Sequence, residues 1–244
     1  MSRYTQRVAT DVGGTFTDLV SFGSEPDTGR PRVLTAKVDT TPPNFEKGVL
    51  HVMEKAGVNP ADIEFLAHGT TVVINALTER KGVSVGLITT QGFRDSLEIA
   101  RGNRPDFFNL SYQKPPVFVP RYLRTEVPGR MTYKGDERQA LDLSGLPTII
   151  DHFKQHDVQA IAICFLHAYA NPAHEEAALK EVQRLWPDVS TVCSHQITRE
   201  WREYERTNTT VLSAYVQPVA ERYLNRLDSG LRDGGLPQSP YIMQ

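Results

Sequence analysis

The sequence contains little cysteine and little tryptophan, with two residues of each among 244. Cys164 and Cys193 offer no pair with the spacing of a zinc site. Both lie in apolar, β-prone stretches, which predicts two buried, reduced thiols, and a disulfide is not expected. His167, His174 and His195 are too dispersed in the sequence to argue for a metal, although ligands from different segments can converge.

Long apolar runs and runs of one charge are also missing. The 27 basic and 29 acidic residues give a net charge of −2, and no basic run is interleaved with aromatic residues. This balance excludes a general attraction to nucleic acid or to a membrane surface. No apolar stretch approaches the length of a membrane span, and no signal peptide is visible at the N-terminus. We therefore expect a soluble, cytoplasmic protein that binds neither nucleic acid nor membrane.

What the sequence does contain is a Gly-Gly turn between two β-prone runs near the N-terminus. Glycines let backbone N–H groups approach a ligand closely, and the neighbouring threonines add hydroxyl donors. Asp11 and Asp18 cannot bind phosphate directly, because like charges repel. An aspartate beside a phosphate site instead holds Mg²⁺ or its waters, or orients a nucleophile. The turn predicts a magnesium-nucleotide site, the alternative being an ordinary hairpin with polar decoration. Its candidate residues are Asp11, Gly13, Gly14, Thr15, Thr17 and Asp18.

Periodicity predicts an α/β lobe over residues 1–100. Three consecutive strands are followed by helix, strand, helix, strand and helix, an order typical of a ribonuclease-H-like lobe. The expected strands are 8–12, 15–22, 32–39, 63–67 and 83–88, and the expected helices end at Gly57, near Gly82 and at Ala100.

Residues 101–135 follow a different pattern, because prolines and aromatic side chains alternate there without periodicity. Prolines prevent regular pairing while aromatic residues favour burial, which predicts a long ordered loop packed on a neighbouring lobe or subunit. Residues 125–133 are expected to form a strand pair.

A second α/β segment is expected over residues 136–244. Its last long pattern is helical from 203 to 231, and Pro218 should kink that helix or divide it. The chain stops at 241–244, inside an expected strand. The other expected elements are helices 143–155 and 173–185 and strands 158–165 and 189–193.

Three further segments strengthen the interpretation of the Gly-Gly turn: His68–Gly82, Gly92–Asp95 and Arg202–Pro218. Together with the turn they closely resemble the hydantoinase A / 5-oxoprolinase family, which also supplies subunits of the acetone and acetophenone carboxylases. The resemblance runs from Val8 to Gln244. It implies an actin-like ATPase fold of the Hsp70 and sugar-kinase type, with Asp11–Asp18 as the phosphate-binding hairpin. It also implies ATP-dependent activation of a carbonyl or amide oxygen. In such an enzyme we expect Asp11 or Asp18 to hold Mg²⁺ through water, and Asp11 is the metal candidate.

The sequence departs from the family in two respects. Val73-Ile74 stands where the family more often has Ala-Thr, a hydrophobic change that a helix should tolerate. Family members are also several times longer, and in relatives the strand at 241–244 leads to the second half of the nucleotide site. We therefore expect an N-terminal lobe that is no autonomous ATPase and is stable only in a hetero-oligomer, beside a hydantoinase B-like subunit or a full-length paralogue.

The segment from His68 to Thr71 lies at a strand-to-helix junction, where free N–H groups and the helix dipole favour an anion. With the resemblance, Gly69, Thr70 and Thr71 become candidate nucleotide contacts. His68 becomes a candidate acid or base because histidine titrates near neutrality. The alternative is that a threonine caps the helix and His68 is merely packed.

Two groups of arginines have less specific roles. Arg101 and Arg104 flank a Gly-Asn pair in a region that the resemblance places near the substrate, and a guanidinium fork suits a carboxylate or phosphate. The mixed charges from Arg199 to Arg206 predict a solvated, ion-paired helix face, or else a lobe or subunit interface.

The leading hypothesis is the nucleotide-binding lobe of an ATP-dependent enzyme that phosphorylates the amide oxygen of a lactam or hydantoin, or the enol oxygen of a ketone. Catalysis of such a transfer depends on positioning and charge stabilisation, here by Asp11, Asp18 and His68. One alternative is a non-catalytic structural subunit beside a full-length paralogue. A less favoured one is a relative of the sugar or acetate kinases, which share the phosphate-binding hairpin.

Overall fold

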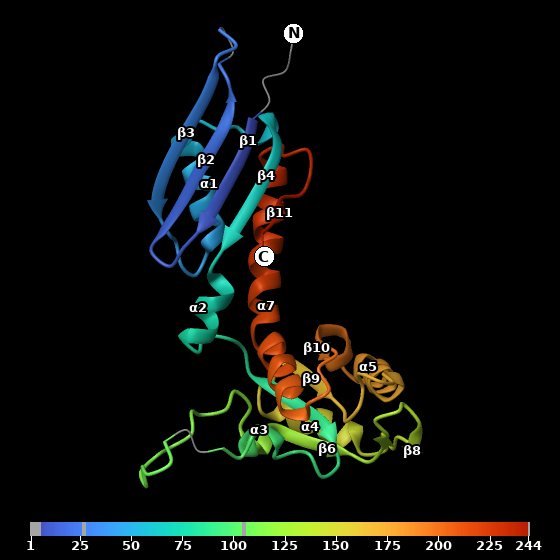
Figure 1. Cartoon of the computed structure of the whole chain (residues 1–244). Helices are drawn as coiled ribbons and strands as arrows, with labels where there is room; N and C mark the ends of the chain where they lie inside the picture. Colours follow the sequence, from blue (N-terminus) through green and yellow to red (C-terminus); the bar gives the residue numbers. More distant parts are fainter. Residues whose placement is uncertain (1–5, 26–27, 104–105, 244) are drawn as a thin grey trace. The chain divides into compact units, whose positions relative to one another are not determined.

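The computed structural model of the chain describes residues 6–25, 28–103 and 106–243, and these form two units (Figure 1). The two ends of the chain build one unit, and the middle of the chain builds the other. The first unit consists of Met1–Lys81 with Val219–Gln244, and the second of Gly82–Pro218.

The boundaries of these two units differ from the expected ranges of 1–100, 101–135 and 136–244. Leu227, from the C-terminal region, is fully buried in the core of the first unit. The strand expected at 83–88 pairs instead with strands of the second unit. The boundaries between the units are set by contacts between segments that are distant in the sequence, and local periodicity cannot predict such contacts.

The first unit is built on a mixed five-stranded sheet. Three consecutive strands form an antiparallel meander, and two later strands then join its other side in parallel. This arrangement confirms the mixed α/β, ribonuclease-H-like lobe predicted from the sequence. From one edge to the other, the strands are β11 (Tyr241–Ile242), β4 (Ile63–Thr70), β1 (Gln6–Val12), β2 (Phe16–Ser24) and β3 (Pro31–Asp39).

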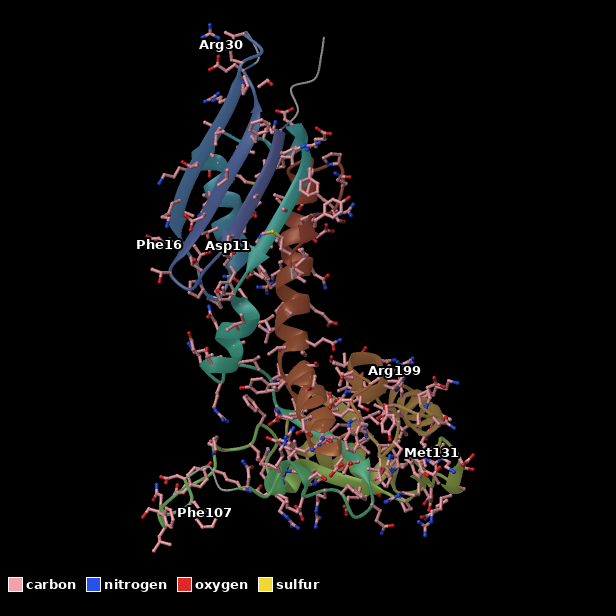
Figure 2. The ribbon with its side chains drawn as sticks, in the orientation of Figure 1. Asp11, Phe16, Arg30, Phe107, Met131 and Arg199 are labelled. Atoms are coloured by element: carbon pink, nitrogen blue, oxygen red, sulfur yellow. The ribbon has the colours of Figure 1, made fainter. Side chains whose placement is uncertain are left out.

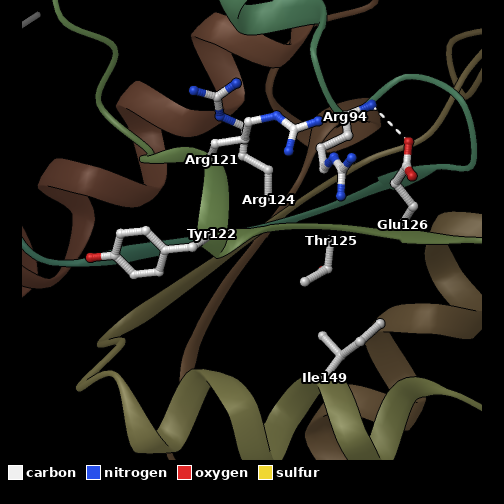
Figure 3. Close-up of a pocket in the computed structure, with 7 residues that line it drawn as sticks. All are labelled: Arg94, Arg121, Tyr122, Arg124, Thr125, Glu126 and Ile149. Carbon is white, nitrogen blue, oxygen red and sulfur yellow. Dashed lines mark hydrogen bonds between the residues drawn. The ribbon is translucent and has the colours of Figure 1, made fainter.

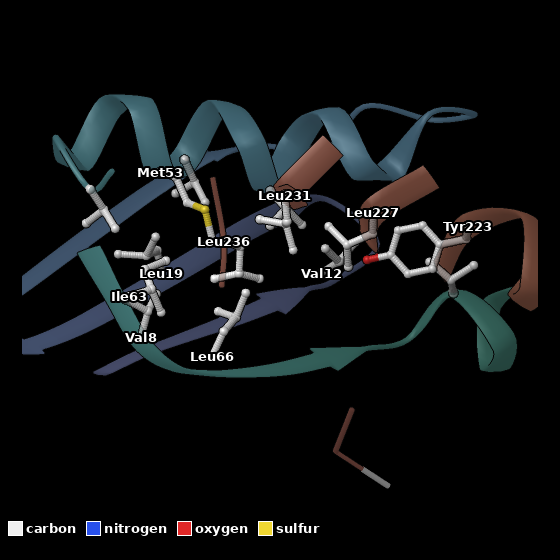
Figure 4. Close-up of a cluster of buried hydrophobic side chains, with 14 residues drawn as sticks. Val8, Val12, Leu19, Met53, Ile63, Leu66, Tyr223, Leu227, Leu231 and Leu236 are labelled. Atoms are coloured by element: carbon white, nitrogen blue, oxygen red, sulfur yellow. The ribbon is translucent and has the colours of Figure 1, made fainter. Parts of the chain in front are cut away.

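One face of this sheet carries the core of the first unit. The alternation of buried and exposed residues along β1 directs Val8 and Val12 to this face. They pack against Met53 of α1 (Phe45–Ala56) and against the C-terminal part of α7 (Glu203–Asp233), as Figure 4 shows. Helix α1 ends at Gly57, whose φ of 64° is the left-handed conformation that favours glycine at a helix end. Two short elements complete the unit: η1 (Pro60–Asp62) and α2 (Val72–Thr78).

The second unit contains a four-stranded parallel sheet. Every residue of its two central strands is buried, as expected for a parallel sheet covered on both faces. In spatial order the strands are β10 (Ser190–Cys193), β9 (Ala160–Cys164), β5 (Val85–Thr90) and β6 (Arg124–Val127).

Helices and a small hairpin surround this sheet. The hairpin pairs β7 (Arg130–Met131) with β8 (Glu137–Gln139). The N-terminal part of α7, up to Pro218, also belongs to this unit. The remaining elements are α3 (Ser96–Ile99), η2 (Arg121–Leu123), α4 (Leu146–Gln155), α5 (Ala173–Leu185) and α6 (Ser194–Ile197).

Three local expectations need correction. The strand pair expected at 125–133 does not form, because β6 joins the parallel sheet and β7 pairs with β8 instead. The helix expected to end at Ala100 is only the single turn Ser96–Ile99. The division expected at Pro218 does not occur, because α7 is helical over all of its 31 residues, and the alternative, a kink at Pro218, stays a prediction.

Cys164 and Cys193 are both free and buried, which confirms the predicted burial, and their reduced state stays a prediction. In the loop after α3, Phe107 and Phe108 are 74% and 91% exposed, and Figure 2 shows Phe107 far out on it. The expected packing of this loop on a neighbour remains a prediction. Among the described helices, none is both long enough and apolar enough to span a bilayer.

Candidate functional site

The Gly-Gly turn between β1 and β2 is held in a fixed shape by hydrogen bonds. The Gly13 amide donates to the Phe16 carbonyl at 2.9 Å. Thr40 also bonds to the turn, because its amide donates to the Thr15 carbonyl and its hydroxyl donates to the Gly13 carbonyl. Neither glycine has a positive φ. A Cβ on Gly13 would lie 3.2 Å from the Phe16 carbonyl oxygen, so close approach explains the glycine.

Backbone donors are left over in this turn. The amides of Gly14 and Thr15 form no hydrogen bond with the part of the chain that the structure describes. Both residues are exposed. Successive unpaired amides at a turn are the arrangement that binds the oxygens of an anion.

The carboxyl ends of β1 and β4 meet beside this turn, because the two strands are parallel neighbours. Asp11 is paired in register with Gly69, and a Cβ at position 69 would lie 2.8 Å from the Asp11 Oδ1 atom. Gly69 thus leaves a notch that the Asp11 carboxylate occupies. Thr71 ties the strands together, since its amide donates to the Val12 carbonyl at 2.9 Å and its hydroxyl at 3.2 Å.

The two aspartates of the hairpin have different surroundings. They are cross-strand partners and therefore lie on the same face of the sheet. Asp18 forms an ion pair of 3.1 Å with Lys37, whereas Asp11 forms none with a described residue. Asp11 is exposed, and its carboxylate is of the kind that holds a hard divalent cation or its waters.

Thr17 points away from the exposed face. It is completely buried, with its hydroxyl 3.3 Å from that of Thr40. A Cβ on Gly48 of α1 would lie 2.8 Å from the Thr17 hydroxyl oxygen, so Thr17 fills the space that this glycine leaves. Its place is in the packing between β2 and α1, beneath the turn.

The His68 imidazole is completely buried and has a partner at each nitrogen. Thr10 Oγ1 lies 2.7 Å from Nδ1, and Tyr223 Oη of α7 lies 2.6 Å from Nε2. Burial lowers the pKa of His68 from 6.5 to about 4 and also raises the pKa of the Tyr223 hydroxyl. The ring is therefore neutral at pH 7 and ties β4 to α7.

A pocket of about 630 Å³ opens next to the turn, entirely within the first unit. Gly14 and Asn75 line it together with Tyr223, Arg222 and Arg226 of α7. The sequence identified the glycine as a candidate but not the three residues of α7. They lie about 150 positions further along the chain, and the only local signal was the apolar helical face that Tyr223 shares.

Of the arginines considered for a substrate, Arg101 forms an ion pair with Glu205 in the second unit, and Arg104 lies outside the described residues. The solvated face predicted for the charged cluster is wrong for Arg206, which is 1% exposed. Its guanidinium donates to the Ser194 hydroxyl at 3.2 Å and to the Phe165 carbonyl at 2.6 Å.

Ser194 connects Arg206 to a buried carboxylate, Glu175, which has no exposed side-chain surface. It accepts hydrogen bonds from the Phe165 amide, the Ser194 hydroxyl, and both the amide and the ring of His195. The hydrogen bond to Glu175 raises the pKa of His195. Arg206 and Glu175 therefore form the two ends of a buried polar network, which explains why a charged residue faces inward here.

Glu175 also belongs to a group of side chains that could bind a metal ion, because Glu175, Cys193 and His195 place ligand atoms within 4.8 Å of one another. Four donors already satisfy the carboxylate, so the cluster is explained as a structural network. Among the other histidines, His174 pairs with Glu137 at 2.7 Å and His167 contacts Tyr169 at 3.2 Å.

Comparison with known proteins adds to this geometry. Residues 7–186 match the family described as the hydantoinase/oxoprolinase N-terminal region. The whole chain is 37% identical to caprolactamase subunit alpha of Pseudomonas jessenii and covers 36% of that protein. It is 31% identical, over 85% of its length, to the acetophenone carboxylase gamma subunit of Aromatoleum aromaticum, of which it covers 30%.

The fold is also that of a solved relative. The crystal structure of the ATP-dependent caprolactamase from Pseudomonas jessenii matches 98% of this chain with a TM-score of 0.82 at 35% identity, and 35% of that chain is covered. The chain thus spans about a third of the length of the relatives it matches.

Proposed function

Because the chain belongs to the hydantoinase/oxoprolinase family, we propose that its first unit binds the phosphate groups of ATP and serves an ATP-dependent enzyme. The hairpin turn supports this proposal most directly. It has two unpaired amides and follows directly on β1, where the Asp11 carboxylate lies against Gly69 of β4. Donors for an anion and a carboxylate for its magnesium ion therefore lie within one hairpin.

The residues of the site divide into those that touch the ligand and those that hold them in place. Gly14 and Thr15 offer unpaired amides, whereas Gly13 shapes the turn through the hydrogen bond of its amide to the Phe16 carbonyl. Thr70 ends β4 beside this turn, and the Thr71 hydroxyl holds the junction by donating to the Val12 carbonyl. Asp11 would hold Mg²⁺ through water.

The other candidates act from behind this surface. Thr17 is buried beneath the turn, and Asp18 is neutralised by Lys37. His68, with both nitrogens occupied, serves to position β4 and Tyr223 rather than to transfer a proton to substrate.

The substrate we propose is an amide or a ketone, since a caprolactamase and an acetophenone carboxylase are among the relatives. ATP supplies a phosphoryl group, which makes an amide carbon a better electrophile or fixes a ketone as its enol. The protein's own contribution is to hold the phosphate oxygens on the turn amides and to compensate their charge.

Both relatives are named as subunits, so we place this chain in a multi-subunit enzyme. The partner we propose is a hydantoinase B-like subunit or a full-length paralogue. The two free, buried thiols support a reducing, cytoplasmic location.

The test compares Asp11→Asn with Asp18→Asn in the whole chain, with magnesium-ATP at millimolar concentration observed by phosphorus NMR. Asp11→Asn should weaken binding by about tenfold or more, equivalent to about 1.4 kcal/mol. Asp18→Asn is the matched control, because it removes a carboxylate already paired with Lys37, and its effect should be small. Equal effects of the two changes, or unaltered ATP signals with the unmodified chain, would contradict the proposal.

A further inference from the structure

A second pocket, of about 670 Å³, lies in the second unit beside the edge strand β6. Three arginines, Arg94, Arg121 and Arg124, gather along one side of it, and Ile149 of α4 lies on the opposite side (Figure 3). The hairpin site shares no residue with this pocket. Guanidinium groups on one side and the aliphatic Ile149 on the other suit a small molecule with an acidic end and an apolar body.

Two of the arginines are partly neutralised by neighbouring carboxylates. Arg121 binds both oxygens of Asp95, at 2.9 and 3.0 Å. Arg124 donates to Glu98 at 2.7 Å. Among the described residues, no carboxylate forms an ion pair with Arg94. The nearby Glu126 uses one oxygen to accept the backbone amides of residues 92 and 94.

Two guanidinium nitrogens of this wall are buried without a hydrogen bond: Nε of Arg94 and Nη1 of Arg124. The Arg124 side chain is only 1% exposed, and its Nη1 is 3.8 Å from Asp95 Oδ1, too far for a hydrogen bond. Its other nitrogens are occupied, by the Val119 carbonyl and by Glu98. A buried donor left unsatisfied costs about 1 to 3 kcal/mol, so such a group calls for a partner.

We propose that this pocket binds the carboxylate group of a small organic acid, held by Arg94 and Arg124. A carboxylate offers two oxygens to guanidinium donors in a geometry that arginine matches well. Charge favours a monoanion, because three arginines already face Asp95, Glu98 and Glu126, and a phosphate dianion would add a second uncompensated charge. The pocket is also larger than a single anion, and its apolar side leaves room for a carbon chain.

The experiment titrates the whole chain with sodium hexanoate, at constant ionic strength, and follows the arginine Nε–H signals by NMR. The Arg94 signal should shift and saturate, and inorganic phosphate should bind more weakly than hexanoate. Arg94→Gln should weaken hexanoate binding by about tenfold, as expected for loss of a charge-assisted hydrogen bond. The matched control is Arg184→Gln, which removes an exposed arginine paired with Glu181 in the same unit and should leave binding unchanged.

Each alternative result overturns the assignment in its own way. An Arg94 signal that does not saturate with hexanoate rules out the site, and this titration decides the matter even where Arg94→Gln does not fold. Tighter binding of phosphate than of hexanoate rules out the carboxylate. An equal loss in Arg184→Gln shows that the acid binds to general surface charge.

Discussion

The buried His68 should make the first unit lose stability as the pH falls below neutrality. Its folded-state pKa is about 4, against 6.5 for an unperturbed histidine, because burial disfavours the charged ring. Between these two values the unfolded chain binds a proton that the folded chain does not, so the free energy of unfolding falls as the pH falls. Stability from this group is fully present above pH 6.5 and is lost as the pH approaches 4.

The size of the effect follows from the shift. A full displacement from 6.5 to about 4 corresponds to about 3.4 kcal/mol. Between pH 7 and pH 5 the expected loss is about 2 kcal/mol, a large part of the stability of an ordinary domain. Two other histidines also shift, His195 upward through Glu175 and His167 downward through burial, and both lie in the second unit.

Hydrogen exchange at the amides of β1 and β4, corrected for the intrinsic rate at each pH, isolates the first unit. The same measurement on His68→Gln, which cannot titrate at this position, removes the contribution of every other group. Between pH 7 and pH 5, the free energy of unfolding of the unmodified chain should fall by about 2 kcal/mol more than that of the variant. Equal losses in the two proteins, or a His68 imidazole that titrates near 6.5 by NMR, would refute the reasoning.

Two further predictions concern packing in the second unit, and both are checked by urea denaturation with tryptophan fluorescence as the signal. Gly86→Ala should destabilise by about 1 to 3 kcal/mol, because its Cβ would lie 2.6 Å from the Phe153 ring. Gly145→Ala, with no atom within 4 Å of the new methyl group, is the control and should be nearly neutral. Arg206→Met should cost about 3 to 5 kcal/mol, because it leaves the buried Glu175 network without its cation. A loss no greater than that of the surface change Arg184→Met would show that Arg206 contributes little there.

Much of the first sheet could be predicted from the sequence because its strands are locally determined. Alternation along β1 and β2 and a Gly-Gly turn between them specify a hairpin without help from the rest of the chain. The end of α1 at Gly57 was predictable for the same reason, since only the local backbone decides it. The Asp11–Asp18 pairing follows once the hairpin register is known.

What could not be predicted depends on contacts between distant segments. The Tyr223 partner of His68 is 155 residues away, and nothing near either residue indicates the other. Arg206 was misread because alternating charge suggests a solvated face. In the structure Thr210 and Ala214, which follow at helical spacing, are buried as well, and this places Arg206 on the inner face of α7.

The candidate nucleotide site draws on residues from both ends of the chain, although its motif is confined to residues 11–18. The turn amides come from the N-terminal hairpin, the notch from Gly69, and one wall of the pocket from α7 beyond Pro218. A chain that ended at Pro218 would keep every residue of the motif. It would nevertheless leave His68 Nε2 buried without its partner and remove Tyr223, Leu227 and the other α7 side chains that cover the sheet. Such a chain would keep the hairpin and its N-terminal contacts but lose the support that α7 gives to the sheet, because part of what holds the site comes from the opposite end of the sequence.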